Sequence, residues 1–250
     1  MPTIMPNEPL ASWPCDEGVI GVVGVAPWAT IDFLQSLYSL VVADKDWDYP
    51  RVISDINTKI PSRGRYLELG ERSPVPFIKA TIKELTAIGA TVVIVPCNTA
   101  HILYHEWSSN SQVIIPNIIQ ETVQDMLQQS AKRVSVLASA AVDKYDLYHK
   151  PLVEAGLSVI RLSELQQSLV SAAISDVKVN GALSEDMVDK IDSLLRDLSR
   201  QGAEGIILGC TELKCITSRC YLHNLVVSES NMALAKAALR LVNIKKYHIL

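Results

Sequence analysis

The chain has 250 residues, of which 48% are hydrophobic and 20% are charged, and its formal net charge is −4. This is enough apolar material for one large core or two smaller ones. No run of like charges indicates a nucleic-acid site or a membrane-surface site, and the apolar stretches are far shorter than the ~20 residues of a membrane-spanning helix. We therefore predict that neither nucleic acid nor a membrane is a partner.

The N-terminus and the cysteines indicate where the protein works. Residues 1–17 are rich in proline and have no basic start followed by an apolar core, so they do not resemble a secretory signal. We expect an N-terminal extension on a cytoplasmic protein. Such a protein keeps its thiols reduced, so we predict no disulfide framework. The five cysteines are Cys15, Cys97, Cys210, Cys215 and Cys220.

Short β-rich runs alternate with helical patterns along the chain. The elements expected in the first half are strands at 19–25, 51–53 and 91–95 and helices at 30–41 and 76–88. The pattern then restarts, with strands at 133–138, 158–160 and 205–208 and two helices between 164 and 201. This alternation predicts the α/β class, with parallel sheets covered by helices.

The second half of the chain repeats the first around one cysteine. The segment IGATVVIVPCNTAH (residues 88–101) can be laid over QGAEGIILGCTELK (residues 201–214). Both contain Gly-Ala, an apolar strand, and a cysteine that a threonine follows within two residues. Each buried strand brings its cysteine to the carboxyl end of a sheet, where open α/β sheets place their ligands. We therefore predict two pseudo-symmetric α/β domains with the active site in the cleft between them.

Free cysteines in proteins are most often small core residues. We accept that interpretation for Cys215 and Cys220, because neither ends a strand pattern, and we assign no role to Cys15. Cys97 and Cys210 differ, since each ends a repeated strand and is followed by polar residues. We predict that these two are catalytic.

Two thiols on facing halves suit the inversion of a carbon centre. One base cannot reach both faces of the carbon, whereas a thiolate on one face and a thiol on the other can exchange a proton with it. We expect a helix N-terminus after each strand to lower the thiol pKa from about 8.5. Backbone N–H groups there, with Asn98, Thr99 and Thr211, would hold a carboxylate and stabilise the developing charge. No electron-sink cofactor is then needed, and we predict none.

A metal site is not predicted either. His101 and His105 are one helical turn apart, as a pair of metal ligands can be, but no third ligand is in view.

Two segments carry a family resemblance. VPCNTAH (residues 95–101) and LGCTEL (residues 208–213) resemble the twin active-site signatures of the aspartate/glutamate racemase superfamily. DINTKIPSRGR (residues 55–65) and VGVAPWATIDF (residues 23–33) resemble elements of its aspartate-racemase branch. The chain departs from that branch at Ser62, where the branch usually has aspartate, and in its first turn, which is one residue shorter.

This resemblance implies racemisation of aspartate independent of pyridoxal phosphate, with glutamate as a second substrate, by a homodimer. It implies a first domain of residues 18–116 plus 229–250, with the C-terminal helix returning to it, and a second domain of residues 117–228. The substrate-binding residues that we predict are Asn57, Arg63, Asn98, Thr99, Ser139, Lys178, Thr211 and Glu212.

For three of these residues the prediction is more specific, or a purely structural role is an alternative. Arg63 would grip the side-chain carboxylate of the substrate, and Lys178 would add a second positive charge or simply end its helix. Glu212 would orient the second site or open a helix.

Other functions stay open at this point. They are maleate isomerisation, arylmalonate decarboxylation, and a catalytically retired module that binds amino acids. Retention of both cysteines argues against the last.

Overall fold

The computed structural model of the protein describes residues 17–243 and contains two parallel β-sheets there. Their strand orders are β2-β1-β3 and β5-β4-β6-β7. The strands are β1 (Ile20–Val23), β2 (Val52–Asp55), β3 (Val92–Ile94), β4 (Arg133–Ala138), β5 (Ser158–Val159), β6 (Gly205–Gly209) and β7 (Val226–Glu229). The predicted α/β class is confirmed, whereas β7 was not expected from the sequence.

The two sheets are built alike. In each sheet the first strand along the chain pairs in parallel with the next two, β1 with β2 and β3, and β4 with β5 and β6. Ile20 thus lies opposite Val52 and Val92. Strands β3 and β6 hold equivalent places, and the chain leaves both at the carboxyl edge of their sheet. The repeat found in the sequence is therefore a repeat in the topology.

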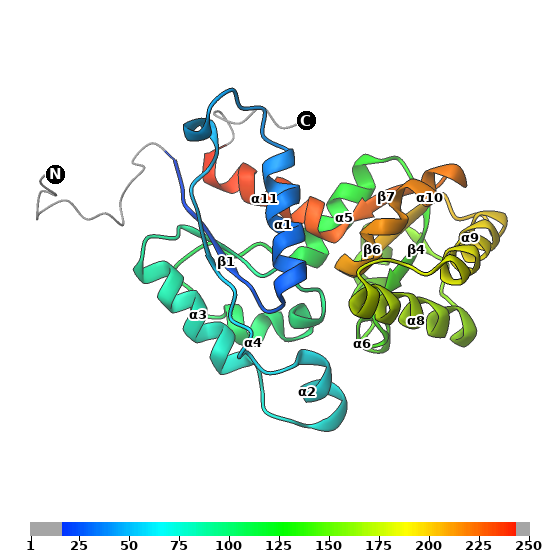
Figure 1. Ribbon diagram of the computed structural model, residues 1–250, viewed down its shortest axis with the longest axis horizontal. Coiled ribbons are helices and arrows are strands. Elements are labelled where there is room, and N and C mark those ends of the chain that lie inside the picture. The colour runs from blue at the N-terminus through cyan, green and yellow to red at the C-terminus, as the bar shows by residue number, and fades with distance from the viewer. Residues whose placement is uncertain (1–16, 244–250) are drawn as a thin grey trace, which may run out of the picture.

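Helices divide around the two sheets into two lobes, as Figure 1 shows. The helices up to residue 108 are α1 (Pro27–Ser39), η2 (Asp46–Asp48), α2 (Arg63–Leu69), α3 (Val75–Ala87), η3 (Thr99–Leu103) and α4 (Tyr104–Ser108). Those that follow are α5 (Ile118–Gln128), α6 (Ala140–Lys144), α7 (His149–Glu154), α8 (Glu164–Asn180), α9 (Glu185–Arg200), η4 (Thr211–Ile216), α10 (Thr217–Leu222) and α11 (Ser230–Asn243). The η elements are short 3-10 helices.

Helix α11 joins the two lobes. It leaves β7 of the second sheet, runs back toward the first lobe and packs against α1 and α5 (Figure 1). At its end the Val242 carbonyl accepts a hydrogen bond of 3.0 Å from the Gly18 amide. One apolar cluster includes Ile20 of β1, Phe33 of α1, Ile207 of β6 and Leu234 of α11, all of them fully buried. This shared core holds the two sheet edges in place relative to each other.

Local signals in the sequence set the ends of two helices that carry predicted site residues. Ser62 caps α2 by accepting a bond from the Arg65 amide, which puts Arg63 in the first turn of that helix. Gly181 ends α8 with a φ of 75°, a conformation that glycine adopts readily. Lys178 consequently lies in the last turn of α8.

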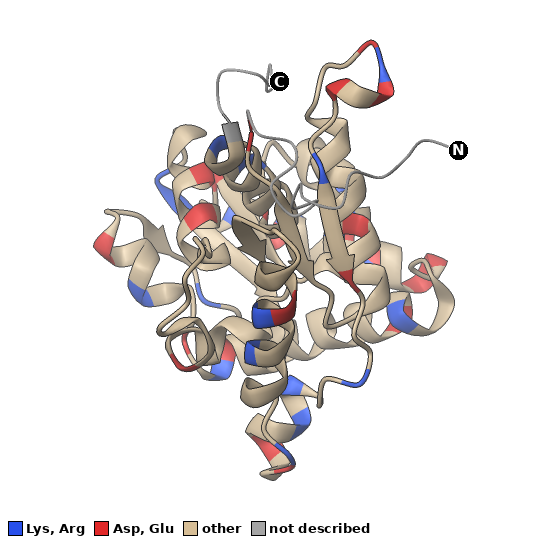
Figure 2. Cartoon of the chain, turned by 90° about the vertical axis from the view of Figure 1, so that its left-hand side faces the viewer, with Lys and Arg blue, Asp and Glu red and all other residues tan. Residues whose placement is uncertain are grey.

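Positively and negatively charged residues are interspersed along the outer helices and loops in the view of Figure 2. Within residues 17–243 no helix is both long and apolar enough to span a bilayer. Apart from Glu17, the predicted extension with Cys15 lies outside the described residues, as do residues 244–250. The predicted domain boundaries stay predictions.

Candidate active site

Cys97 and Cys210 line the same pocket. Cys97 follows β3 after the link Val95–Pro96, and Cys210 directly follows β6. The pocket has a volume of about 280 Å³ and lies at the carboxyl edges of both sheets. It is lined by Ala26, Ala29, Ser62, Arg63, Gly64, Glu68, Pro96, Cys97, Asn98, Thr99, Ser139, Ala140, Ala141, Lys178, Gly209, Cys210, Thr211 and Glu212. Nine of the ten residues predicted from the sequence as catalytic or substrate-binding are in this lining.

Asn57 is the predicted residue that is absent from the lining. It follows β2, where its Nδ2 donates to Thr81 Oγ1 at 3.3 Å and its Oδ1 accepts from the Lys59 amide at 3.1 Å. The structure therefore gives Asn57 a role in the turn after β2.

The Cys210 thiol donates a hydrogen bond of 3.0 Å to Glu212 Oε2, which also accepts from Thr211 Oγ1 at 3.1 Å. Burial raises the pKa of the Cys210 thiol well above its ordinary value, and the negative charge of Glu212 raises it further. Lys178 Nζ lies 3.7 Å from Glu212 Oε1 and opposes this shift only weakly. Cys210 is therefore a thiol at neutral pH.

This finding corrects one expectation. We expected a helix N-terminus to lower the pKa of Cys210, but the helix that follows is the six-residue 3-10 helix η4. Burial and the neighbouring carboxylate outweigh the dipole of so short an element. Burial also raises the pKa of the Glu212 carboxyl. The bonds from Cys210 and Thr211 and the charge of Lys178 outweigh that effect, so Glu212 is ionised.

Backbone contacts hold Cys97. Its amide donates to the Val95 carbonyl at 2.8 Å, and its carbonyl accepts from His101 Nδ1 at 2.9 Å. His101 is buried beside the rings of Tyr104 and Trp107. This burial lowers the pKa of His101 to about 4, so the imidazole is neutral at physiological pH. This contact between His101 and the Cys97 carbonyl was not expected from the sequence.

The side chain of Asn98 is built into the wall of the pocket. It is buried, its Nδ2 donates to Ser230 Oγ at 2.9 Å, and its Oδ1 accepts from Tyr148 Oη at 2.6 Å. Nearby, the hydroxyl oxygens of Thr99 and Ser139 lie 3.4 Å apart and connect the two lobes. These two hydroxyls, unlike the Asn98 amide, have spare capacity for a ligand.

Arg63 brings an unsatisfied donor to the pocket. Its Nε is buried without a hydrogen-bond partner, and its Nη1 donates to the Pro61 carbonyl at a long 3.4 Å. Buried donors are normally paired, so Arg63 Nε suits an oxygen of a bound ligand.

Glu68, which was not expected from the sequence, lines the pocket from the same helix. Its position four residues after Gly64 puts both on one face of α2.

The first turn of α1 also borders the pocket, through Ala26 and Ala29. The chain is tight here, because a Cβ on Gly24 would lie 2.9 Å from Ile56 Cα. The shortened turn that the sequence analysis noted is thus part of the pocket wall.

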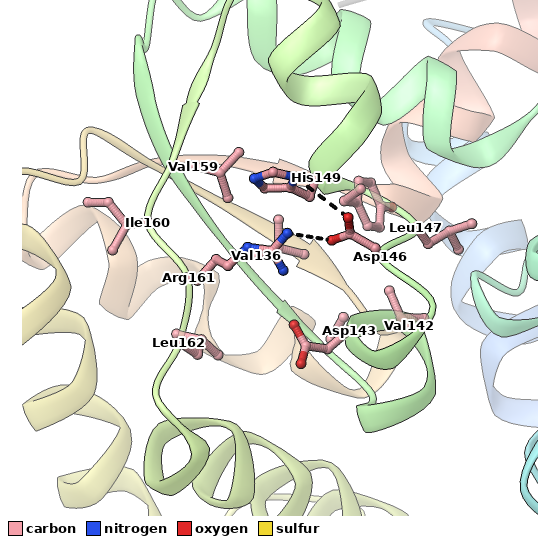
Figure 3. Close-up of a pocket in the computed structure, with 12 residues that line it drawn as sticks. Val136, Val142, Asp143, Asp146, Leu147, His149, Val159, Ile160, Arg161 and Leu162 are labelled. Carbon is pink, nitrogen blue, oxygen red and sulfur yellow. Dashed lines mark hydrogen bonds and ion pairs between the residues drawn. The ribbon is translucent and has the colours of Figure 1, made fainter.

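Another pocket is lined by residues of β4, β5 and the segment 142–149 (Figure 3). Its volume is about 30 Å³, which holds little more than a water molecule. It is too small for an amino acid.

Comparison with known proteins identifies the family. The model of the Asp/Glu/hydantoin racemase family matches residues 20–238. The chain belongs to this family. The broad specificity amino-acid racemase RacX of Bacillus subtilis (strain 168) is 27% identical over 227 residues, which are 88% of this chain and 96% of RacX.

Solved structures agree with this assignment. The aspartate racemase of Picrophilus torridus has a TM-score of 0.79 and 26% identity, with 92% of this chain and 97% of that one covered. Glutamate racemase isoform RacE1 of Bacillus anthracis shares the fold, with a TM-score of 0.65 and 15% identity over 90% of this chain and 82% of that one. The chain is accordingly an amino-acid racemase, an isomerase whose substrate is an amino acid.

Proposed function

We propose that the chain racemises aspartate reversibly and without a cofactor, using Cys97 and Cys210 as the two acid–base groups. The observation that carries this proposal is the single pocket lined by both thiols together with Arg63 and Lys178. Each lobe supplies one thiol and one cation to that pocket. Glutamate would be a weaker substrate.

In the proposed reaction the thiolate of one cysteine removes the α-proton from one face of the substrate. The C–H bond breaks, its electron pair spreads into the α-carboxylate, and a thiol forms. The thiol of the other cysteine then gives its proton to the opposite face and becomes a thiolate. The reverse reaction exchanges the two roles, so the net proton count is unchanged.

The charge that develops on the α-carboxylate requires hydrogen-bond donors. The hydroxyls of Thr99 and Ser139 line the pocket beside the two strand ends and would supply them, together with backbone N–H groups. The hydroxyl of Thr211 already donates to Glu212, so Thr211 would contribute through its backbone N–H. Asn98 would contribute its backbone, because its side-chain amide is engaged with Tyr148 and Ser230.

The positive charges support an acidic substrate. A second carboxylate in a closed pocket is costly unless it is paired. Arg63 has a buried, unpartnered Nε and a planar fork that suits a carboxylate, whereas Lys178 is exposed and already lies 3.7 Å from Glu212. We assign the side-chain carboxylate of aspartate to Arg63. Lys178 would add a weaker attraction.

One observation favours a second candidate, a racemase of broader specificity. Glu68 lines the pocket with a carboxylate that has no hydrogen-bond or ion-pair partner among the described residues. A free carboxylate tolerates the ammonium of any amino acid and disfavours a second acidic group. The 27% identity to a broad specificity racemase is in keeping with this candidate.

The two candidates are separated by a substrate panel. Purified protein, treated with a chelator and without pyridoxal phosphate, is given each L- and D-amino acid in deuterated water. Loss of the α-proton signal in the NMR spectrum reports exchange with solvent. Loss of the circular dichroism signal reports racemisation. We expect aspartate to react fastest. Equal rates on neutral amino acids would favour the broader enzyme, and dependence on a metal or on pyridoxal phosphate would refute the proposed mechanism.

We also propose a homodimer. Helix α1 leaves Trp28, Ile31 and Tyr38 exposed on one side, and Trp28 is 76% exposed. An apolar face of this kind is typical of an association surface. Sedimentation velocity of wild type and Trp28→Glu tests it, because a dimer that uses this face dissociates in the variant.

A further inference from the structure

Tyr148 is a buried residue that contacts two residues of the pocket lining and that the proposed reaction does not use. It precedes α7 and is 2% exposed. Its Oη donates to Asn98 Oδ1 at 2.6 Å. Its ring lies against Gly209, where a Cβ would be only 3.1 Å from Tyr148 Cε2. One rigid side chain thus touches both strand ends of the site.

The two residues that Tyr148 touches are the neighbours of the two thiols. Asn98 directly follows Cys97, and Gly209 directly precedes Cys210. A planar ring cannot shorten or bend, so it acts as a spacer between the two segments. The absence of a side chain at position 209 is what lets the ring come this close.

The hydroxyl of Tyr148 stays a donor throughout the working pH range. Burial raises its pKa, and the bond with Thr122 opposes this only in part. The proton is therefore not available for catalysis. The hydroxyl donates this proton in the hydrogen bond to Asn98 Oδ1. Asn98 Nδ2 in turn donates to Ser230 at the start of α11.

The segment that carries Tyr148 is itself anchored. Asp146 adopts a φ of 54°, and Figure 3 shows its carboxylate pointing toward Arg161, 2.8 Å away, and toward His149. In the same segment, Tyr145 Oη donates to the Leu67 carbonyl of α2 at 3.2 Å. The second lobe thus contacts the first through a segment that these bonds hold in place.

We propose that Tyr148 is a positioning residue, which sets the separation of the two thiols through its ring and the orientation of the segment at Asn98 through its hydroxyl. The proposal rests on the two-thiol function proposed above. Because small displacements of reacting groups are costly, loss of Tyr148 should act mainly on the chemical step. Substrate affinity should change much less.

Two substitutions separate the roles of ring and hydroxyl. Tyr148→Phe keeps the ring, and we expect kcat to fall about tenfold with KM changed less than about threefold. Tyr148→Leu removes the spacer, and we expect kcat to fall about 100-fold or more. Tyr104→Phe is the matched control, because its Oη makes a comparable bond of 2.7 Å to the Ile115 carbonyl away from the pocket. It should lose similar thermal stability and keep its kcat.

A second measurement does not depend on activity. Dibromobimane fluoresces only when it has alkylated two thiols, and peptide mapping identifies a bridge between Cys97 and Cys210. We expect bridging to be fast in wild type and in Tyr148→Phe, and slow in Tyr148→Leu. In the double variant Tyr148→Phe/Asn98→Ser, kcat should fall no further than in the worse single variant, since the hydroxyl acts through Asn98.

The outcomes separate this proposal from the proposed function. If wild type racemises no amino acid but Tyr148→Leu still loses bridging, the function is wrong and the spacer role stands. If wild type racemises aspartate while both Tyr148 variants match it in kcat and in bridging, the positioning role is wrong. If Tyr148→Leu does not fold, Tyr148→Phe decides: a kcat like that of Tyr104→Phe overturns the proposal.

Discussion

The two thiols occupy equivalent backbone positions but differ in their surroundings. Cys210 donates to a carboxylate two residues later, at Glu212. The corresponding residue after Cys97 is Thr99, a hydroxyl, and in the described part of the chain no hydrogen bond ends on Cys97 Sγ. The repeat therefore places two thiols symmetrically, and the side chains around them break the symmetry.

The rest of each half-site shows the same contrast. In the second lobe the charges are internally paired, since Glu212 is bonded to Thr211 and Cys210 and faces Lys178. In the first lobe Arg63 Nε and the Glu68 carboxylate have no partner within residues 17–243. We infer that the first lobe binds the polar groups of the substrate, while the second holds its cysteine ready as an acid.

Thermodynamics limits how this asymmetry can be observed. Two enantiomers have equal free energy in an achiral solvent, so kcat/KM must be the same in both directions for every variant. A difference between the thiols appears only in kcat and KM taken separately, and in the exchange of the α-proton by each enantiomer.

Removal of either thiol should have the largest effect. We expect Cys97→Ala and Cys210→Ala each to lower racemisation by on the order of 10⁴-fold, because each removes the acid–base group of one face. Each variant should still exchange the α-proton of one enantiomer, and the two variants should differ in which one. Deuterium incorporation into pure L- and D-aspartate measures this.

Cys215→Ala is the matched control: the expectation that Cys215 lies in the core is wrong, since it is an exposed thiol, and it does not line the pocket. It should retain full activity. Substantial racemisation by either of the other two variants would show that a two-thiol mechanism is wrong.

Substitution of Arg63, one of the two cations of the pocket, should have the next largest effect. Arg63→Leu should cost about 2–5 kcal/mol in kcat/KM for aspartate, as truncation of one partner of a buried charge pair does. Lys178→Met should cost about 1 kcal/mol or less, because Lys178 is exposed and already faces Glu212. Alanine, if it reacts, should be affected much less by either change. If Arg63→Leu lowered kcat/KM equally for aspartate and alanine, Arg63 would not bind the side-chain carboxylate of the substrate.

Much of the fold could be predicted from the sequence, because buried strands leave a strong pattern. The strand at Arg133–Ala138 was predicted with its observed bounds. Strand β7 was not expected, since its four residues Val226–Glu229 end in polar groups and lack the long apolar run of β6. Short edge strands depend on pairing with a neighbour, and pairing is not visible in local sequence.

The site could be predicted where it depends on the repeat and not where it depends on contacts across the fold. The position of Cys97 and Cys210 at strand ends follows from the sequence alone. The raised pKa of Cys210 depends on burial and on the rotamer of Glu212, which no spacing reveals. Tyr148 is 50 residues from Asn98 in the chain, so their contact becomes visible only in three dimensions.

The two half-sites also differ in the side chain that lies four residues after each cysteine, which is His101 after Cys97. In the repeat it corresponds to Lys214, whose Nζ donates to Asp32 of α1 at 2.9 Å, whereas His101 bonds to the carbonyl of Cys97. Burial lowers the pKa of His101 from 6.5 to about 4, so the unfolded chain binds a proton there between these pH values and the folded chain does not. Stability from this residue is full above pH ~6.5 and is lost as the pH falls toward ~4, by about 3 kcal/mol.

Urea denaturation at pH 7 and pH 4 tests this in wild type and in His101→Phe, which keeps an aromatic ring beside Tyr104 and Trp107. The variant should be less stable at pH 7, because the bond to the Cys97 carbonyl is gone. Its loss of stability between the two pH values should be smaller than that of wild type by about 3 kcal/mol. The carboxylates titrate equally in both proteins, so an identical pH dependence would show that His101 is not buried as a neutral imidazole.

The smallest effect concerns the carboxylate that distinguishes the two thiols. In Glu212→Gln the negative charge that raises the pKa of Cys210 is removed, while burial, the larger cause, remains. The pKa of this thiol should therefore fall yet stay above its ordinary value. Titration of the thiolate absorbance in a Cys97→Ser background measures it. In the direction that uses Cys210 as base, kcat rises as this thiol ionises, so the rising limb of its pH profile should move to lower pH by the same amount.

Glu68→Gln is the control for this last change, because Glu68 lines the same pocket but makes no bond to either thiol. It removes an equal charge, so a general change of potential in the pocket would shift the titration in both variants alike. A shift confined to Glu212→Gln ties the asymmetry to the direct bond between Cys210 Sγ and Glu212 Oε2. No shift in Glu212→Gln would mean that burial alone keeps Cys210 protonated, and the two thiols would then differ only in how deeply each strand end is covered.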